Sequence, residues 1–323
     1  MAPAISVSNL SRKGGIIALI TLVFVWSLAA IVRQLSFFHQ PLSLALRLPL
    51  RRHDPPLILY AYKESQNARE NLKFFLDQGL HGSADFIFIL NGETDVADLI
   101  PKEKNIRVVQ RPNVCFDLGA FGEVLRADDL WKKYQHFITI NASLRGPFIP
   151  HWSKQCWSDA YLDRVTDDVK LVGMTINCSP KPHVQSMIWA TDNIGMEFLL
   201  YPPSNSSELD PYGTANDTVA FGGCYEEFHQ AIHAEVGATS VIRNAGYQIS
   251  AMMSAFQGEQ YLDKCDEHPK DLLYDGKYFG TNLHPYDTIF FKANRGIDPT
   301  TLDLLSRLHL SGYPGRSWEL CRR

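Results

Sequence analysis

Polar residues stand at or after the carboxyl ends of several predicted strands, where a ligand could be bound. Asn91, Asp117 and Asn141 each follow an apolar run, and Ser143 and Arg145 come shortly after Asn141. In a parallel α/β sheet, ligands bind beyond the carboxyl ends of the strands, where the strand order reverses. A guanidinium group at such a place can bind a phosphate through two hydrogen bonds. The alternative for Arg145 is a surface arginine in a turn.

Acidic side chains that could move a proton form a second group of candidates. Glu235 lies on a long predicted helix, and its carboxylate could accept the proton of a hydroxyl group if burial raised its pKa towards neutral pH. Asp192 is a second acidic candidate. The alternative for Glu235 is a solvent-facing glutamate, and the alternative for Asp117 is a helix N-cap, which aspartate fills readily. Gly119, two residues after Asp117, would allow close approach of the backbone.

Histidines form a third group. His229 and His233 are four residues apart on one predicted helix, a spacing that can bind a metal, although two polar residues on an exposed face are the commoner explanation. His284 stands beside a proline, where a histidine is more often structural. Lys292 and Arg295 follow His284 and could contact phosphate. No two cysteines have the C-x-x-C spacing of a zinc or redox motif.

An alternating pattern of strands and helices must position these residues. Apolar runs predict strands at 57–62, 85–92, 105–111 and 136–143, and helical spacing predicts helices at 67–79, 94–101 and 115–125 between them. Later segments predict a strand at 168–178, an apolar segment and amphipathic helix at 182–200, a polar loop at 202–223, and a helix from 226 to near 246 followed by a strand. The alternation predicts an α/β fold with a parallel sheet covered by helices.

A series of motifs, in their order along the chain, carries a resemblance to a known family. They are NASLRGP (141–147), PHVQS (182–186), EVG (235–237) with AGY (245–247), and HPYD (284–287). Over roughly residues 57–296, the chain resembles GT-A-fold glycosyltransferases, in particular the rhamnan-synthesis protein F group and related eukaryotic type II membrane proteins. The resemblance implies a GT-A-like, Rossmann-like mixed sheet that is mostly parallel and flanked by helices.

The resemblance also implies roles for the candidate residues. The residues that would bind the nucleotide-sugar donor are Asn91, Asp117, Gly119, Asn141, Ser143, Arg145 and His284. Glu235 would be the general base of an inverting displacement, with Asp192 in reserve. His183 and Gln185 would lie on the acceptor side.

The metal site of metal-dependent GT-A enzymes has no counterpart in the sequence. Those enzymes bind Mn²⁺ or Mg²⁺ through the carboxylates of D-x-D at the end of the fourth strand, where this chain has Asn141-Ala142-Ser143. Amide and hydroxyl oxygens are weak ligands for these cations. The sequence leaves three possibilities: the metal is dispensable, other residues such as His284 hold it, or catalysis has been lost.

Composition and charge exclude several classes of protein. The 323 residues are 45% hydrophobic and carry 31 Lys+Arg against 35 Asp+Glu, which describes a packed protein and not a disordered one. The chain has no long basic run, so we do not expect it to bind nucleic acid. It also has no G-x-S-x-G motif of the kind that hydrolases use.

The uncharged apolar segment 14–32 is long enough for a helix that spans a bilayer. We expect a short cytoplasmic tail at 1–13, a transmembrane signal anchor at 14–32, a stem at 33–56 and a lumenal GT-A-like domain at 57–323. A cleaved signal peptide is the alternative. The arginines that follow the segment favour the opposite orientation.

Cysteines and glycosylation triplets favour the lumenal orientation. All six cysteines follow the apolar segment, as do N-x-S/T triplets at Asn141, Asn177, Asn205 and Asn216. We therefore expect a single-pass type II protein of the Golgi or endoplasmic reticulum membrane. It would move a sugar from a nucleotide-sugar donor to a glycan or glycoconjugate. The alternative is a catalytically inactive lumenal protein of the same fold that binds glycans or scaffolds enzymes.

Overall fold

The computed structural model describes residues 54–257, 265 and 271–321, which lie in one compact unit of the chain. The predicted tail at 1–13, the predicted anchor at 14–32 and nearly all of the predicted stem at 33–56 lie outside the described residues. Within the described residues, no helix is both long and apolar enough to cross a lipid bilayer.

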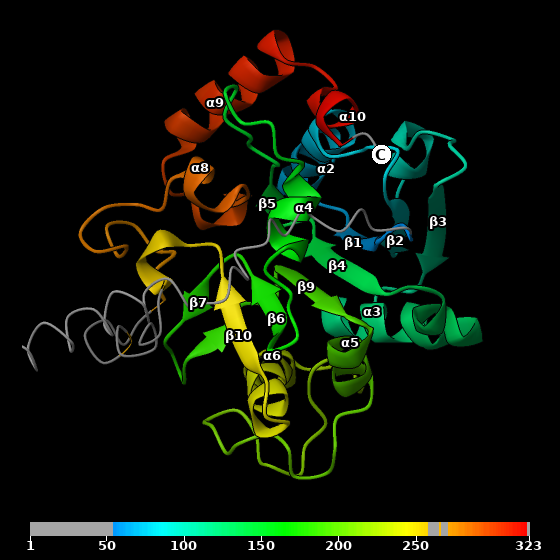
Figure 1. Ribbon diagram of the computed structural model, residues 1–323, viewed down its shortest axis with the longest axis vertical. Coiled ribbons are helices and arrows are strands. Elements are labelled where there is room, and N and C mark those ends of the chain that lie inside the picture. The colour runs from blue at the N-terminus through cyan, green and yellow to red at the C-terminus, as the bar shows by residue number, and fades with distance from the viewer. Residues whose placement is uncertain (1–53, 258–264, 266–270, 322–323) are drawn as a thin grey trace, which may run out of the picture. The chain divides into compact units, whose positions relative to one another are not determined.

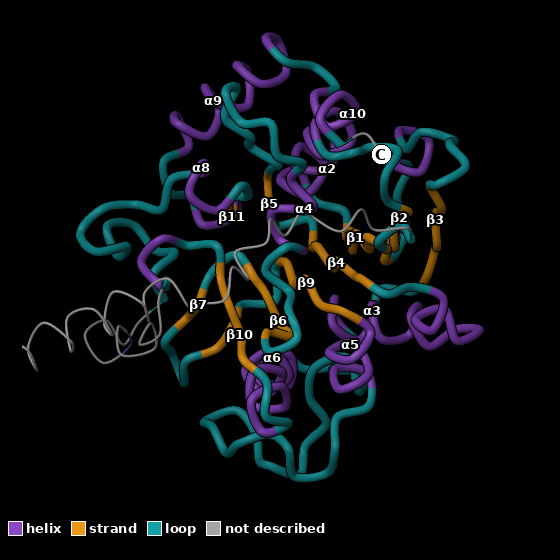
Figure 2. Tube along the Cα trace, viewed as in Figure 1, coloured by secondary structure: helices purple, strands orange, loops and turns teal. Residues whose placement is uncertain are grey.

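A mixed, mostly parallel sheet of seven strands lies at the centre of the fold (Figure 1, Figure 2). In chain order its strands are β1 (Leu57–Lys63), β2 (Asp85–Asn91), β3 (Ile106–Arg111), β4 (His136–Asn141), β6 (Val169–Gly173), β9 (Ile188–Asp192) and β10 (Gln248–Ala251). They are arranged as β10-β6-β9-β4-β1-β2-β3. Strand β9 runs antiparallel to both of its neighbours, and the other pairs are parallel. The predicted α/β sheet is confirmed, with one strand reversed.

Helices cover both faces of this sheet (Figure 1). Helices α2 (Gln66–Gln78) and α4 (Trp157–Leu162) pack on one face, and α3 (Phe116–Arg126), α5 (Asn193–Leu200) and α6 (Phe228–Asn244) pack on the other. Helices α2 and α3 lie on opposite faces because the chain moves outward from β1 to β3 and then returns to β4, and crossovers between parallel strands are right-handed.

Shorter elements and the C-terminal helices complete the described chain. They are η1 (Val96–Leu99), η2 (Ala127–Lys133), η3 (Ser254–Phe256), α8 (Pro285–Thr288), η5 (Ala293–Arg295), α9 (Pro299–Gly312) and α10 (Arg316–Leu320). Helices α9 and α10 both contact α2.

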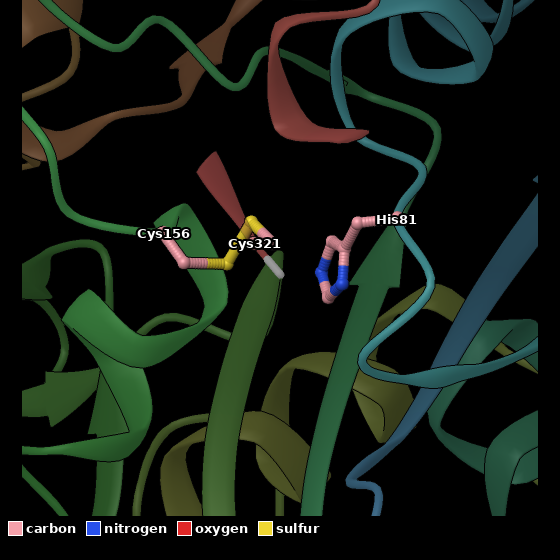
Figure 3. A group of neighbouring side chains, drawn as sticks. All are labelled: His81, Cys156 and Cys321. Carbon is pink, nitrogen blue, oxygen red and sulfur yellow. A yellow bond between two sulfur atoms is a disulfide. The ribbon is translucent and has the colours of Figure 1, made fainter. Parts of the chain in front are cut away.

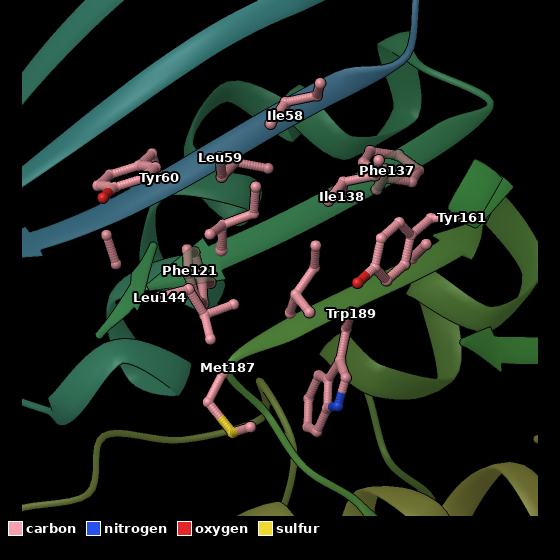
Figure 4. Close-up of a cluster of buried hydrophobic side chains, with 14 of the residues drawn as sticks. Ile58, Leu59, Tyr60, Phe121, Phe137, Ile138, Leu144, Tyr161, Met187 and Trp189 are labelled. Atoms are coloured by element: carbon pink, nitrogen blue, oxygen red, sulfur yellow. The ribbon is translucent and has the colours of Figure 1, made fainter. Parts of the chain in front are cut away.

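The hydrophobic core lies between the sheet and these helices (Figure 4). The first six residues of β1 are buried, as expected of a central strand that is covered on both faces. Tyr60 of β1 packs against Phe75 of α2 with ring centroids 4.9 Å apart. On the other face, Phe121 of α3 packs against Phe221 at 5.9 Å. Burial of these large side chains from water is the main force that holds the layers together.

Two short strands bring the C-terminal part of the chain to the end of β4. Strand β5 (Leu144–Arg145) pairs antiparallel with β11 (Phe291–Lys292). Just beyond this pair, the backbone N–H of Ala293 donates to the carbonyl oxygen of Ser143 at 2.9 Å. Residue 292 therefore lies beside the polar loop that follows β4.

Two segments differ from the sequence prediction. The predicted strand at 168–178 is interrupted after Gly173, and its end forms β7 (Ile176–Asn177), which pairs with β8 (His183–Val184) in a separate small sheet. A Cβ on Gly173 would lie 2.2 Å from Cγ1 of Val184, so the chain passes too closely there for a side chain. The predicted helix at 94–101 is only the 3₁₀ turn η1.

Disulfides join all six cysteines of the chain: Cys115–Cys224, Cys156–Cys321 and Cys178–Cys265. The pairing, which the sequence left open, is thereby determined. Disulfides persist in oxidising environments, so they are compatible with a secreted or lumenal protein. The first bond fixes the residue before α3 to the segment that precedes α6.

Helix α3 packs on the segment 221–224 through two glycines. A Cβ on Gly122 would lie 2.2 Å from the carbonyl oxygen of Phe221, and a Cβ on Gly119 would lie 2.9 Å from that of Gly223. The sequence predicts that Gly119 allows close approach of the backbone, and the resemblance places it among the donor-binding residues. In the structure, the backbone that approaches it closely belongs to the protein itself.

We predict that Gly122→Ala lowers the free energy of unfolding by about 1–3 kcal/mol, the usual cost of overpacking. Gly312→Ala is the control, because the nearest atom to its Cβ is 3.9 Å away and alanine favours helix over glycine. Urea unfolding of the full-length, oxidised protein measures both. Wild-type stability in Gly122→Ala would contradict the close packing.

Candidate functional site

The carboxyl ends of the parallel strands meet at one edge of the sheet. The strand order reverses between β1 and β4, because β2 and β3 lie on one side of β1 and β4 lies on the other. In open α/β sheets this is the position at which ligands bind. Asn91 and Asn141 end β2 and β4 at this edge, and Asp117 lies in the first turn of α3 after β3.

Asp117 and Asn141 are joined by a hydrogen bond at this edge. Asn141 Nδ2 donates to Asp117 Oδ2 at 2.6 Å, and Asn141 Oδ1 accepts from the Ser143 hydroxyl at 2.5 Å. Asp117 Oδ1 accepts from the backbone N–H of Leu118 at 3.0 Å. Burial raises the pKa of Asp117, and the negative charge of Glu235 adds to that rise, although the Asn141 hydrogen bond acts against it. The structure thus joins three predicted residues in one network.

Glu235 lies on α6, and both of its carboxylate oxygens are hydrogen-bonded. Oε1 is 3.1 Å from Nε2 of His183, and Oε2 accepts from the backbone N–H of Ser186 at 3.0 Å and from the Ser186 hydroxyl. Burial alone would raise the pKa of Glu235. The hydrogen bonds and positive charge of His183, together with Ser186 and the charge of Lys292, outweigh burial and lower this pKa to about 2. The condition under which Glu235 could act as a base, a pKa raised towards neutral pH, is therefore not met.

The imidazole of His183 lies between two acceptors. Nδ1 is 2.7 Å from the carbonyl oxygen of Lys181, and Nε2 faces the ionised carboxylate of Glu235. Each ring nitrogen thus faces an oxygen that can accept a hydrogen bond, and the charge of His183 is one of the causes that lower the pKa of Glu235. The His183 side chain is 2% exposed and the Glu235 side chain 22%, so solvent reaches this ion pair from the Glu235 side.

Lys292 is a further basic residue near Glu235 and Asp117. Burial lowers the pKa of Lys292, and the negative charges of Glu235 and Asp117 oppose that shift. Within the described part of the chain, its ammonium group forms neither a hydrogen bond nor an ion pair. We refer to Asp117, Asn141, His183, Glu235 and Lys292 as the polar cluster.

The sequence pointed to most of this cluster but undervalued two residues. It gave Lys292 only as a further phosphate contact after His284, and it gave Ser186 no role. The signal for Lys292 is its position directly after the buried apolar run Ile289–Phe291. Ser186 stands at the end of the PHVQS motif, next to the buried Gln185.

Arg145 is buried and directed towards α2 and α9. Its Nε donates to Asn71 Oδ1 at 2.8 Å, and Nη2 donates to Glu70 Oε2 at 3.0 Å. Nη1 lies 3.5 Å from Asp303 Oδ1. These contacts hold the guanidinium group within the protein. Of these two cations, Lys292 is the one whose charge acts on Asp117 and Glu235.

Asn91 and Gln185 lie near the strand ends but have partners inside the protein. Asn91 Nδ2 donates to the carbonyl oxygen of Tyr62 at 3.1 Å, and its Oδ1 accepts from Arg111 at 2.7 Å. Gln185 Oε1 accepts from the Thr175 hydroxyl at 2.7 Å. Both side chains are buried, so their observed contacts fix the local backbone.

Asp192 cannot share a site with Asn141. Strand β9 is antiparallel to β4, and Asp192 is paired with His136 at the start of β4, whereas Asn141 is at its end. The two residues therefore lie at opposite edges of the sheet. Asp192 accepts from the backbone N–H of Gly195 as the N-cap of α5 and forms an ion pair with Lys170. Its reserve role as the acidic catalytic group beside Asn141 is wrong, because of this geometry.

His284 has no contact with the polar cluster among the described residues. It is exposed, and its Nδ1 accepts from the backbone N–H of Tyr286 at 3.2 Å as the N-cap of the short helix α8. It borders a cavity of about 30 Å³. A cavity of that size has room for little more than a water molecule.

A histidine and two cysteines lie close together at the C-terminal end of α10 but do not indicate a metal site. His81, Cys156 and Cys321 have ligand atoms within 4.8 Å of one another (Figure 3). Cys156 and Cys321 form a disulfide, so their sulfur atoms are not thiolates, the form that binds metal.

The spacing of His229 and His233 does not produce a metal site either. His233 is buried, with Nδ1 2.8 Å from Asp210 Oδ2 and Nε2 3.0 Å from the carbonyl oxygen of Thr214. Both ring nitrogens of His233 are thus occupied, and His229 is exposed.

Comparisons with known proteins add little to this geometry. No protein-family model matches the sequence, and no curated protein matches it. Among solved structures, the crystal structure of HddC from Yersinia pseudotuberculosis is similar at a TM-score of 0.29 and 12% identity, over 46% of this chain and 80% of HddC. A likeness at that level carries no argument about function.

We predict that Glu235 makes stability depend on pH in the acid range. Its pKa is lower in the folded protein than in the unfolded chain, so its ionisation stabilises the fold above the unfolded value, and this contribution is lost as the pH falls towards about 2. Below about pH 5, the free energy of unfolding should fall more steeply for wild type than for Glu235→Gln, by at most about 1.4 kcal/mol per pH unit.

Urea unfolding of the full-length protein at a series of pH values measures the two slopes. Glu103→Gln, which removes an exposed carboxylate, is the control and should follow wild type. If Glu235→Gln and wild type have the same slope, the ion pair with His183 does not exist.

Proposed function

We propose that this chain is a glycosyltransferase of GT-A-like fold that transfers a sugar from a nucleotide-sugar donor to a hydroxyl group of a glycan or glycoconjugate. The proposal rests on the polar cluster, in which a lysine and two carboxylates lie together at the ligand-binding edge of an α/β sheet. Such a transfer needs positive charge for the departing diphosphate and a carboxylate for the proton of the attacking hydroxyl. The mixed sheet is the kind that the GT-A resemblance implies.

Lys292 is suited to the diphosphate. Its ammonium group is a compact charge with three donors and forms no ion pair among the described residues. Asn141-Ala142-Ser143 stands where a D-x-D motif would hold Mn²⁺ or Mg²⁺, and these residues provide no carboxylate. In our proposal, Lys292 supplies the positive charge, and a divalent metal is dispensable for donor binding.

Asp117 is better matched than Glu235 to the role of proton acceptor. A carboxylate with a pKa of about 2 is a weak base at neutral pH, whereas burial raises the pKa of Asp117. As the acceptor hydroxyl attacks the anomeric carbon, its proton passes to Asp117. The bond from that carbon to the diphosphate breaks, and its electron pair stays on the diphosphate oxygen beside Lys292. Glu235 is a positioning residue that holds His183 and Ser186.

Secretory-pathway location belongs to the same proposal. The three disulfides support an oxidising compartment. The apolar segment 14–32 would anchor the chain in the Golgi or endoplasmic reticulum membrane as a single-pass type II protein.

We predict that Lys292→Met weakens the binding of a nucleoside diphosphate at least tenfold, because the charge that pairs with phosphate is removed. Lys292→Arg keeps the charge and should retain most of the affinity. Calorimetry with UDP, GDP and dTDP, in EDTA and again with Mn²⁺, measures this on the full-length protein. Binding that requires Mn²⁺ and is unchanged in Lys292→Met would contradict the role of Lys292.

We predict that Asp117→Asn lowers the rate of transfer by about 10²–10⁴-fold, the usual contribution of a general base. Asparagine can still accept the hydrogen bond from Asn141, so nucleotide binding should persist. Release of nucleoside diphosphate from a panel of UDP-, GDP- and dTDP-sugars is the measurement. Asp129→Asn, a change on the exposed surface of η2, is the control. Full activity in Asp117→Asn would exclude it as the base.

The alternative is an inactive protein of the same fold that binds glycans. It is favoured by the absence of D-x-D and by the internal hydrogen bonds that occupy both oxygens of Glu235. Nucleotide binding separates the two functions, because an enzyme must bind its donor. A chain that binds glycans and no nucleoside diphosphate would be the inactive form.

A further inference from the structure

Two aromatic side chains are exposed side by side next to the polar cluster. Phe116 is 41% exposed and Phe228 is 70% exposed. Their ring centroids are 6.4 Å apart, and the rings are inclined by 48°. Single exposed apolar residues are ordinary, but an exposed pair of large rings beside a candidate site suggests a binding surface. We call Phe116 and Phe228 the aromatic pair.

The aromatic pair extends the polar cluster along α6. Phe116 immediately precedes Asp117, and Phe228 precedes Glu235 by seven residues on one helix. Seven residues are nearly two full turns, so Phe228 and Glu235 lie on the same face of α6, about 10 Å apart along its axis. Besides burial, the charge of Glu235 raises the pKa of Asp117, which agrees with α6 lying beside the start of α3. If the reacting group of a bound molecule lies at the polar cluster, the adjacent part of that molecule lies at the aromatic pair.

The backbone before Asp117 is held in an unusual conformation. Cys115 and Phe116 both have positive φ, 71° and 50°, in the left-handed region that bulky side chains rarely adopt. Such strain persists only where the surrounding structure enforces it, and it is concentrated at ligand-binding sites. Here the Cys115–Cys224 disulfide and the close contact of Gly119 with Gly223 enforce it. These contacts hold the backbone next to Phe116 against the segment that precedes α6.

We propose that the aromatic pair is a carbohydrate subsite, on which a pyranose ring of the acceptor glycan stacks while its reacting hydroxyl lies at the polar cluster. This rests on the proposed function. A pyranose has a face of C–H groups that packs on an aromatic ring, with hydroxyl groups at its rim that remain in water. Rigid aromatic rings supply this contact area at a small entropy cost. The 48° inclination leaves no parallel-walled slot of the kind that holds a flat nucleobase between two rings.

Saturation-transfer NMR on the full-length protein tests the subsite, with methyl pyranosides of glucose, galactose, mannose, rhamnose and fucose as probes. Wild type should transfer saturation to the C–H protons on one face of at least one sugar. Phe228→Ala should reduce that signal at least fivefold, and Phe228→Tyr should restore it. Trp152→Ala removes an aromatic ring that is 82% exposed in another loop and should leave the signal unchanged. Because Phe228 is largely exposed, its variants should keep the wild-type melting temperature.

The same samples separate this inference from the proposed enzyme. Loss of the sugar signal in Phe228→Ala supports the subsite even if calorimetry finds no nucleoside diphosphate binding, in which case only the transferase proposal fails. An unchanged sugar signal in Phe228→Ala overturns the subsite, even if Lys292-dependent nucleotide binding is found. A third outcome would also overturn the subsite: uridine or guanosine is saturated, no methyl pyranoside is, and the nucleoside signal is lost in Phe228→Ala. The rings would then stack on the donor base.

Discussion

The ion pair between Glu235 and His183 fastens helix α6 to the segment that leads into β9. Glu235 accepts from both the backbone and the hydroxyl of Ser186, and the Thr239 hydroxyl, one turn further along α6, accepts from the backbone N–H of Val184. A largely buried carboxylate is stable only when its oxygens are paired, and these groups pair it. Because α6 also carries Phe228, these contacts set the position of the aromatic pair relative to the polar cluster.

The candidate site is therefore assembled from segments that are distant in sequence. Asp117 and Asn141 come from the first part of the sheet, Glu235 comes from α6, and Lys292 arrives through the pairing of β11 with β5. The reversal of strand order between β1 and β4 sets the place where they meet. The Cys115–Cys224 disulfide ties two of these segments together directly. The site depends on the whole fold and not on one loop.

Several candidate residues were of suitable type but are used by the protein for its own structure. Asp192 and His284 both cap helices, and for aspartate this is a common use where a helix begins. Arg145 completes hydrogen bonds between β5 and α2. A side chain that could bind a phosphate or a proton can equally form a hydrogen bond with another group of the protein. The choice depends on which groups lie within about 3 Å, a distance that sequence spacing does not give across elements.

The sequence by itself determined the α/β class and most of the strands, because a buried strand corresponds to a short apolar run bounded by turn residues. It also placed Asp117 and Asn141 among the candidates, since polar residues that follow such runs lie near the sheet edge, and it placed Glu235 there as an acidic residue on a long predicted helix. Only the tertiary structure decided that β9 is reversed, which carries Asp192 to the far edge, and that Lys292 faces the two carboxylates. It likewise decided the sign of the pKa shift of Glu235. That sign depends on the balance between burial and nearby charges, and this balance exists only once distant segments have come together.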